Sequence, residues 1–507
     1  MINLITVELA LYEEDFRLPG PIELVWERNF LSSVERNTLA GRYWQFAHDQ
    51  YVTLDKERDS FFWQNANGNI VELSYAPLGE ELVCPEEKIK YSHQQDKVTI
   101  YDYDKDLTYH YTHCGGDPNT YKLTAITRHR FAILLFYTSQ GLLKHLIDSC
   151  GRKLKLTTDT HRRITAIELL DKNHPPQPQE RYHYNDKNWL TTVHDALNQP
   201  LVYHYNDEQL ITRTDRNGHH QHWKHQRCGS CPGQPLRCTA RWFNNKQQYE
   251  AFDYQPGKTL VKNTLGHTTT HHHHKGNITQ VQDPNGHTEQ WFYDIDGQMR
   301  SYTDPLGQKT YYGYDQYGQQ ISVSTPNGGG VCYIYKNHKI TMAKNSHNAV
   351  WIWEYNDQGL LECRIGPDKD ITRYHYTDDL LTKIIDPNGQ DITLHYNDQD
   401  ILEKIILPNG QQTQWHYNSQ GQLLKAVSGQ HNPVHYKHDP LGRITQIPPS
   451  NLRLQPQRQT AKPPRKQHQN PTPIQRHRPA HRHQQRTQKH LPLYTRRGRP
   501  HHRRTRL

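Results

Sequence analysis

The sequence predicts an all-β protein, an antiparallel array of β-hairpins, from three observations. One turn motif recurs in phase, another motif of alternating aromatic residues lies between the turns, and Pro-Gly pairs every 20 residues or so would break any helix. The turn motif is seen in these copies, whose prolines lie 21 residues apart: Asp283-Pro284-Asn285-Gly286, Asp304-Pro305-Leu306-Gly307 and Thr325-Pro326-Asn327-Gly328.

The turn residues have distinct physical roles. Proline presets φ at the second turn position, aspartate caps the turn, and glycine at the fourth position is typical of a type I turn. The phase returns at Pro367, Pro387 and Pro408, with steps of 20 and 21 between them. We assign a structural role in the repeat turns to Asp283, Pro284, Gly286, Asp304, Pro305, Gly307, Asp386, Pro387 and Gly389.

The strands between the turns carry aromatic residues at positions i and i+2. Copies include Tyr182-His183-Tyr184, Tyr203-His204-Tyr205 and Trp415-His416-Tyr417. Residues two apart share one face of a strand, so we interpret these pairs as cross-strand packing rather than a ligand platform. A single hairpin cannot bury its apolar face alone, so the array must stack its hairpins, either as a closed shell or as a solenoid.

Charge and composition limit the function classes. Residues 448–507 hold 16 of the 61 Lys and Arg and none of the 52 Asp and Glu, which leaves the first 447 residues with a net charge of −7. That disfavours nucleic-acid binding by the body. With 32 Tyr and 10 Trp the body should fold. The longest apolar run, Phe131–Tyr137, is too short for a membrane span, and the acidic start is a poor signal peptide. The eight cysteines are dispersed, which favours reduced thiols.

Two regions resemble the bacterial Rhs/YD-repeat family. Residues 312–319 (YGYDQYGQ) are similar to the family's repeat consensus. Residues 15–21 (DFRLPGP), 25–30 (VWERNF) and 39–44 (LAGRYW) resemble the small β-domain that precedes the repeats in Rhs proteins, especially those tied to type VI secretion. The resemblance covers about residues 3–447.

The resemblance implies a hollow β-cocoon that encloses a C-terminal toxin until its delivery into a rival or host cell. Secretion spike or chaperone proteins would be partners, and the protein would be cytoplasmic until secreted. The family also has a PAAR region, a self-cleavage motif and a toxin domain. We expect this chain to lack all three. It begins within the N-terminal domain, Asp439-Pro440-Leu441-Gly442-Arg443 reads as an ordinary repeat turn rather than the cleavage motif, and no recognisable toxin domain follows.

We predict three domains: an N-terminal Rhs-associated β-domain over residues 1–85, a repeat shell over 86–447 with an insertion near 226–248, and a disordered basic tail over 448–507. The tail has ten prolines and one aromatic residue, Tyr494, and cannot form a packed core. It is an out-of-frame translation of further repeats, a basic arm that binds nucleic acid, or a variable cargo. We favour the first of these, a frameshift.

The sequence offers no catalytic constellation and predicts no cofactor. Cys228 and Cys231, with Cys238 and His225, form a weak zinc candidate beside a simpler interpretation as a surface loop with free thiols. The run His271-His272-His273-His274 occupies an aromatic-pair position, so alternation splits it between two faces.

The sequence therefore predicts a non-enzymatic fragment of a toxin-enclosing shell, truncated and without cargo, that would act in interbacterial competition. The alternative is a cell-surface carbohydrate-binding module, in which exposed rings such as Trp351, Tyr374 and Trp415 stack on sugars. A truncated shell would leave an open strand edge near residues 436–447, and such edges promote aggregation.

Overall fold

The computed structural model describes residues 2–446, except for 7, 34, 172–174, 207, 228–235, 245 and 430–431. These residues form 44 β-strands and no helix, so the predicted all-β class is confirmed. A helix that could span a membrane is accordingly absent from the described part of the chain. The predicted basic tail lies outside the described residues.

The strands fall into three groups along the chain. The first group is β1 (Ala10–Leu18), β2 (Leu24–Leu31), β3 (Asn37–Thr38), β4 (Gly41–Arg42), β5 (Trp44–Phe46), β6 (Tyr51–Asp55), β7 (Ser60–Gln64), β8 (Ile70–Ser74) and β9 (Glu81–Cys84). The second is β10 (Ile89–Gln94), β11 (Lys97–Asp102), β12 (Leu107–Thr112), β13 (Thr120–Arg128), β14 (Phe131–Tyr137), β15 (Leu143–Ile147), β16 (Lys153–Thr158), β17 (Ile164–Leu170), β18 (Gln177–Tyr184), β19 (Leu190–Asp195), β20 (Pro200–Asn206), β21 (Gln209–Thr214), β22 (His220–Arg227), β23 (Leu236–Phe243) and β24 (Gln247–Gln255).

The third group completes the repeat array. It is β25 (Lys258–Asn263), β26 (Thr268–His274), β27 (Asn277–Gln282), β28 (Thr288–Tyr293), β29 (Met299–Thr303), β30 (Lys309–Tyr314), β31 (Gln320–Ser324), β32 (Gly330–Lys336), β33 (Lys339–Asn345), β34 (Val350–Tyr355), β35 (Leu361–Ile365), β36 (Ile371–Thr377), β37 (Leu380–Ile385), β38 (Asp391–Tyr396), β39 (Leu402–Ile406), β40 (Gln412–Tyr417), β41 (Leu423–Ser428), β42 (Val434–His435), β43 (Lys437–His438) and β44 (Ile444–Gln446).

One long antiparallel sheet runs through most of the molecule. From β10 to β42 each strand pairs with the next one along the chain, as a hairpin array requires. The sheet forks at β13, whose first half pairs with β6 while its second half pairs with β14. Strands β1, β2 and β5 form a separate three-stranded sheet.

Several repeat turns are short hairpin loops fixed by one aspartate side chain. At Asp283, the backbone nitrogen donates to the His287 carbonyl at 2.9 Å and Gly286 donates back to the Asp283 carbonyl at 3.1 Å. The Asp283 Oδ1 atom also accepts the backbone N–H groups of Asn285 and His287. Gly286 has a φ of 90°, the left-handed region that a three-residue hairpin loop needs at its end. Asp304 and Asp386 make the same contacts, with Gly307 and Gly389 in the same conformation.

Most repeats also contain a β-bulge at the second aromatic residue. In β38 the register shifts between His395 and Tyr396, and the Tyr396 hydroxyl donates to the Leu381 carbonyl of β37 at 2.9 Å. Burial raises the pKa of Tyr396, so the hydroxyl stays protonated as a donor. Four other tyrosines bond in the same way to a carbonyl 15 residues earlier in the chain, namely Tyr205, Tyr335, Tyr355 and Tyr417. The bulge bends these hairpins at the same place, which contributes to the curvature of the sheet.

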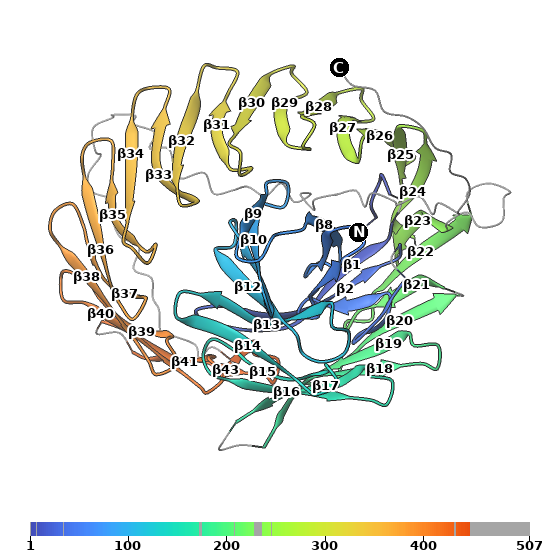
Figure 1. Ribbon diagram of the computed structural model, residues 1–507, viewed down its shortest axis with the longest axis horizontal. Helices are drawn as coiled ribbons and strands as arrows, with labels where there is room; N and C mark the ends of the chain where they lie inside the picture. The colour runs from blue at the N-terminus through green and yellow to red at the C-terminus, as the bar shows by residue number, and fades with distance from the viewer. Residues whose placement is uncertain are drawn as a thin grey trace, which may run out of the picture.

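The curved sheet winds around the N-terminal segment and forms a partial shell (Figure 1). Strands β1 and β2 lie near the centre, and the sheet passes outward from β13 through β24 and β31 to β41, which returns to the neighbourhood of β15 and β16. Strand β42 pairs with β41 alone among the described strands, so the sheet does not close on itself. The sequence left two arrangements open, a closed shell and a solenoid. The described strand pairings form an open, spirally curved sheet, so a closed sheet is not formed.

The buried core is confined to the first half of the chain. It runs from Ile2 to Phe252 and contains large side chains such as Trp26, Trp44 and Trp189. Beyond Phe252, Ala343 is the only buried hydrophobic residue in the part of the chain that the structure describes.

Candidate functional site on the inner face of the sheet

The face of the sheet that carries the repeat tyrosines is the concave, inner face. The ring of Tyr182 on β18 packs edge-on against Phe46 at 5.2 Å, and that of Tyr203 on β20 packs against Trp44 at 4.8 Å. The Trp26 indole donates to the Tyr182 hydroxyl at 3.1 Å. Since these partners belong to the central N-terminal segment (Figure 1), the tyrosine face is the inner face.

A buried ion pair joins the N-terminal segment to the sheet. The Arg28 Nε atom lies 2.9 Å from Asp15 Oδ2, and both side chains are at most 1% exposed. Tyr182 donates to the same carboxylate at 2.8 Å, while the Arg28 guanidinium donates to the Tyr203 hydroxyl at 3.0 Å. The guanidinium also lies over the ring of Trp44 at 5.0 Å. Breaking such a pair leaves a charge buried without its partner.

Further charges lie around this pair. Arg216 donates to the fully buried Glu180 at 3.0 Å and faces Asp195 at 3.3 Å, and Arg213 pairs with Glu13. The cluster thus contains four carboxylates (Glu13, Asp15, Glu180 and Asp195) and three guanidiniums (Arg28, Arg213 and Arg216). Burial and the nearby Asp15 and Asp195 raise the pKa of Glu180 to about 9, against the opposing effect of Arg216 and Arg28. Burial in this cluster therefore favours the protonated form of Glu180 at a pH at which an ordinary glutamate is ionised.

The second half of the inner face has no such cover. Between β28 and β41 most inner side chains are aromatic or aliphatic, and apart from the buried Ala343 these are only partly buried. In β36, for example, Tyr374 and Tyr376 are partly buried while Arg373 and His375 on the outer side are exposed. The inner aromatic residues are Trp291, Tyr293, Tyr302, Tyr312, Tyr314, Tyr333, Tyr335, Trp351, Trp353, Tyr355, Tyr374, Tyr376, Tyr396, Trp415 and Tyr417. This uncovered aromatic face can take up apolar groups.

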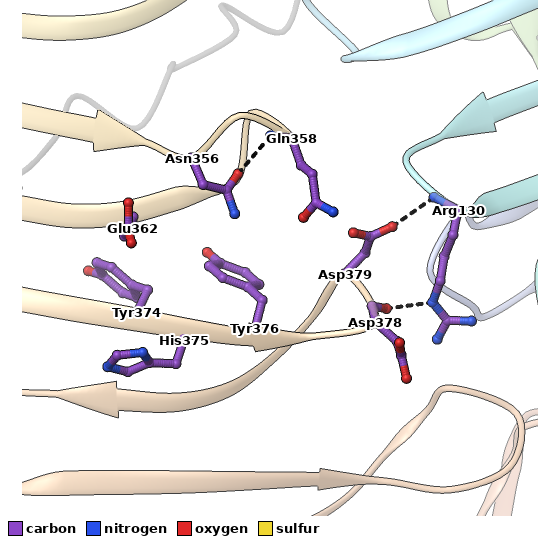
Figure 2. A pocket seen from close by; sticks show the side chains of 9 residues that line it. All are labelled: Arg130, Asn356, Gln358, Glu362, Tyr374, His375, Tyr376, Asp378 and Asp379. Atoms are coloured by element: carbon purple, nitrogen blue, oxygen red, sulfur yellow. Dashed lines mark hydrogen bonds between the residues drawn. The ribbon is translucent and has the colours of Figure 1, made fainter.

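An open groove of about 510 Å³ lies at one rim of this face (Figure 2). Tyr374 and Tyr376 project from β36 on one side of it, and His375 points away from them. Asp378 and Asp379 come from the β36–β37 turn, and Arg130 comes from the distant β13–β14 turn. Asn356, Gln358 and Glu362 complete the lining. The groove combines phenol rings with amide, carboxylate and guanidinium groups.

The residues of the zinc prediction are only partly described. Cys228 and Cys231 lie outside the described residues. His225 and Cys238 are partners in the β22–β23 pairing. Burial raises the pKa of Cys238 to about 12 and lowers that of His225 to about 4. The described residues hold no group of three potential metal ligands, and the zinc site stays a prediction.

The other predicted residues have clear places. The nine turn residues lie in the hairpin loops, and His271 to His274 lie in β26. Trp351, Tyr374 and Trp415 lie on three different strands of the inner face and are partly exposed. The structure brings none of these together with the N-terminal charge cluster.

The charge cluster was not anticipated from the sequence, although a signal existed. Arg28 shares a strand face with Trp26 and Phe30 by the two-residue period, and Glu180 shares one with Tyr182. A charged side chain on an apolar face indicates a buried polar partner. Arg130 offered no such signal, since its partners lie about 250 residues away in the sequence.

Sequence comparisons match two parts of the chain. Residues 1–73 match the family model described as a domain of unknown function (DUF6531), and residues 293–329 match the model described as RHS Repeat. No curated protein matches the sequence.

Solved structures with a similar arrangement include the Tc holotoxin pore of Photorhabdus luminescens with the TccC3-D651A mutation, at 11% identity and a TM-score of 0.49. A second is TcdB2-TccC3 without the hypervariable C-terminal region, at 10% identity and a TM-score of 0.46. They cover 84% and 83% of this chain, which spans 26% of the length of each of those chains.

The repeat match falls on residues that form the hairpins β29 to β31 and their turns. The N-terminal match falls on the segment that holds β1 to β7 and most of β8. Together the two matches support the assignment of the chain as an Rhs/YD-repeat protein.

Proposed function

We propose that this chain forms part of the wall of an Rhs-type shell that encloses a toxin polypeptide, and that it has a structural rather than a catalytic role. The observation that carries the proposal is the uncovered aromatic inner face of β28 to β41. Partly exposed aromatic side chains that line a concave surface favour contact with apolar segments of an enclosed polypeptide.

The biological setting that we propose is the one that the resemblance to Rhs proteins implies. The enclosed partner would be a C-terminal toxin segment, and secretion spike or chaperone proteins would bring the loaded shell to a rival cell through a type VI route. The predicted domain boundaries, at residues 85 and 447, belong to this proposal as well.

A protease-protection experiment tests enclosure. A reporter polypeptide that is unfolded when free is fused after Leu507, and its digestion is compared with that of the free reporter. We expect the fused reporter to survive at least tenfold longer. Digestion of both at the same rate would contradict the proposal.

A matched pair of variants separates the inner face from the outer face. Trp353→Ser with Tyr374→Ser removes two inner rings, and protection should fall severalfold. Phe292→Ser with Tyr311→Ser removes two outer rings that are 63% and 53% exposed, and protection should stay unchanged. Equal effects of the two pairs would show that the inner rings have no special role.

A second candidate function is carbohydrate binding, which the groove of Figure 2 favours. Phenol rings beside carboxylate and amide groups can stack on a sugar ring and accept its hydroxyl hydrogens. Binding on a broad glycan panel should then be lost in Tyr376→Ser and retained in Arg373→Ser, because Arg373 lies on the outer side of β36 and does not line the groove. Absence of binding across the panel would exclude this function.

A further inference from the structure

Two parts of the spiral meet along a line that no strand pairing crosses. The early strands β9 to β17 lie on one side and the late strands β31 to β41 on the other (Figure 1). In the large sheet, the described pairings join neighbours along the chain, apart from β6 with β13, which both lie before β14. The two sides therefore touch only through hairpin turns and side chains. We call this line of contact the seam.

Arg130, in the β13–β14 turn, makes three contacts across the seam. Its backbone nitrogen donates to Asp379 Oδ2 at 2.9 Å, and its guanidinium lies 2.7 Å from Asp400 Oδ1. Its Nε atom donates to the Asp378 carbonyl. Figure 2 shows the first and third of these contacts. One arginine thus joins the late turns after β36 and β38 to an early turn.

Three more early residues make contacts of the same kind. Asp106 pairs with Lys339 at 3.0 Å, Asp171 accepts the Ser419 hydroxyl at 2.7 Å, and Arg152 donates to the Gln420 carbonyl. Nearby, the Tyr103 and His338 rings stack at 3.9 Å. Burial alone would raise the pKa of Asp106, but hydrogen bonds from Tyr101 and Lys339 lower it below its ordinary value. The seam contacts thus extend over several hairpins and are mostly polar.

Contacts of this type are weak and sensitive to salt. The side chains of the Arg130–Asp400 pair are 40% and 25% exposed, and those of Lys339 and Asp106 are 24% and 39% exposed. Exposed ion pairs contribute little, and salt screens them strongly at a concentration of about 1 M. The strands on either side are held by continuous backbone ladders, which salt does not screen in this way.

We propose that the seam is a latch: the late ribbon detaches from the early strands as a unit and opens the shell from the side. Opening needs no strand to unpair, so it leaves every hairpin folded. This inference concerns how the shell opens, and it stands whatever the shell encloses.

Zero-length carbodiimide crosslinking tests the latch. The reagent joins Lys339 to Asp106 only while they touch, and mass spectrometry measures the yield. Lys155 and Glu168, at 3.2 Å, are the control, because they are direct partners in the β16–β17 ladder. From about 0.05 M to about 1 M salt, we expect the seam crosslink to fall at least fivefold relative to the control crosslink. Parallel changes in the two yields, or no change in either, would overturn the proposal.

Two glycine variants test the seam without salt. Gly318 and Gly297 occupy the same turn position with φ of 74° and 75°. A Cβ at Gly318 would collide with the Pro85 carbonyl across the seam, whereas one at Gly297 has its nearest neighbour at an ordinary 3.9 Å. Both alanine variants strain a turn, but only Gly318→Ala should lower the Lys339–Asp106 crosslink severalfold in low salt. Equal yields in the two variants would contradict a latch at this line.

Discussion

The two halves of the shell share one repeat but differ in what covers their inner face. On β18 and β20, Tyr182 and Tyr203 are buried against the N-terminal segment, while on β36 the equivalent Tyr374 remains partly exposed. The turns, bulges and tyrosine hydrogen bonds are alike in both halves. The hairpin repeat is therefore sufficient for the wall itself, and the N-terminal segment adds a core to only one part of it.

The difference predicts unequal stability. Large apolar side chains stabilise a fold mainly when they are fully buried, and this condition holds from Ile2 to Phe252. The late hairpins depend on backbone ladders and on rings that are half covered.

The largest effect is expected from Arg28→Met. The substitution leaves Asp15 buried without its partner, so the early half should lose about 3–5 kcal/mol in its free energy of unfolding. Hydrogen exchange of peptides from β18 to β21 should report the loss, while peptides from β36 to β41 keep their protection. The exposed Arg373→Met is the control. Equal loss of protection in both halves would mean that they unfold as one cooperative unit.

The second effect concerns Glu180 and pH. Its pKa is raised to about 9 in the folded protein, so the folded state binds more protons than the unfolded state above the ordinary glutamate pKa of about 4.3. The stability of the early half should therefore fall as pH rises from about 5 toward 9. Glu180→Gln should flatten this dependence and make the variant more stable than the parent at pH 8, measured by urea unfolding. If the dependence of the unfolding free energy on pH were unchanged in Glu180→Gln, another group would bind the extra proton. Glu362→Gln, at an exposed position, is the control.

A third effect compares two equivalent tyrosines. Tyr396→Phe removes one hydrogen bond to a carbonyl and should cost about 1 kcal/mol. Tyr205→Phe removes the same bond and also the acceptor of the buried Trp44 indole at 2.9 Å, so it should cost about 1–3 kcal/mol. Hydrogen exchange of β19 and β37 measures the two losses. If Tyr396→Phe destabilised the protein as much as Tyr205→Phe, the N-terminal segment that covers Tyr205 would add nothing to its contribution.

The smallest effect is expected at a repeat turn. Gly389 has a φ of 78°, and a Cβ there would meet no atom within 4 Å. Gly389→Ala should then destabilise the hairpin by about 1–2 kcal/mol through backbone strain alone, and Gly389→Asn by less, because asparagine tolerates this conformation. Thermal unfolding measures both. Equal losses of stability in the two variants would mean that the side chain meets a neighbouring atom and that backbone strain is not the cause.

Local features were predictable from the sequence, and long-range ones were not. The period of proline and glycine located the turns, and the alternating tyrosines indicated strands with one aromatic face, because both depend on residues a few positions apart. The fork at β13, the Arg28–Tyr203 contact and the Arg130 seam join residues far apart in the chain. No periodic pattern encodes such pairs. The bulge was also missed, since it changes the register without changing the residue types.

The seam has a consequence for how such a gene changes in length. The described pairs across it are separated by 233 to 270 residues, or about a dozen repeats. Duplicating or deleting one repeat between them would move Arg130 one hairpin out of step with Asp379 and Asp400, although every hairpin would still fold. The contacts across the seam therefore restrict the number of repeats between the early and the late strands, although the folding of each hairpin does not.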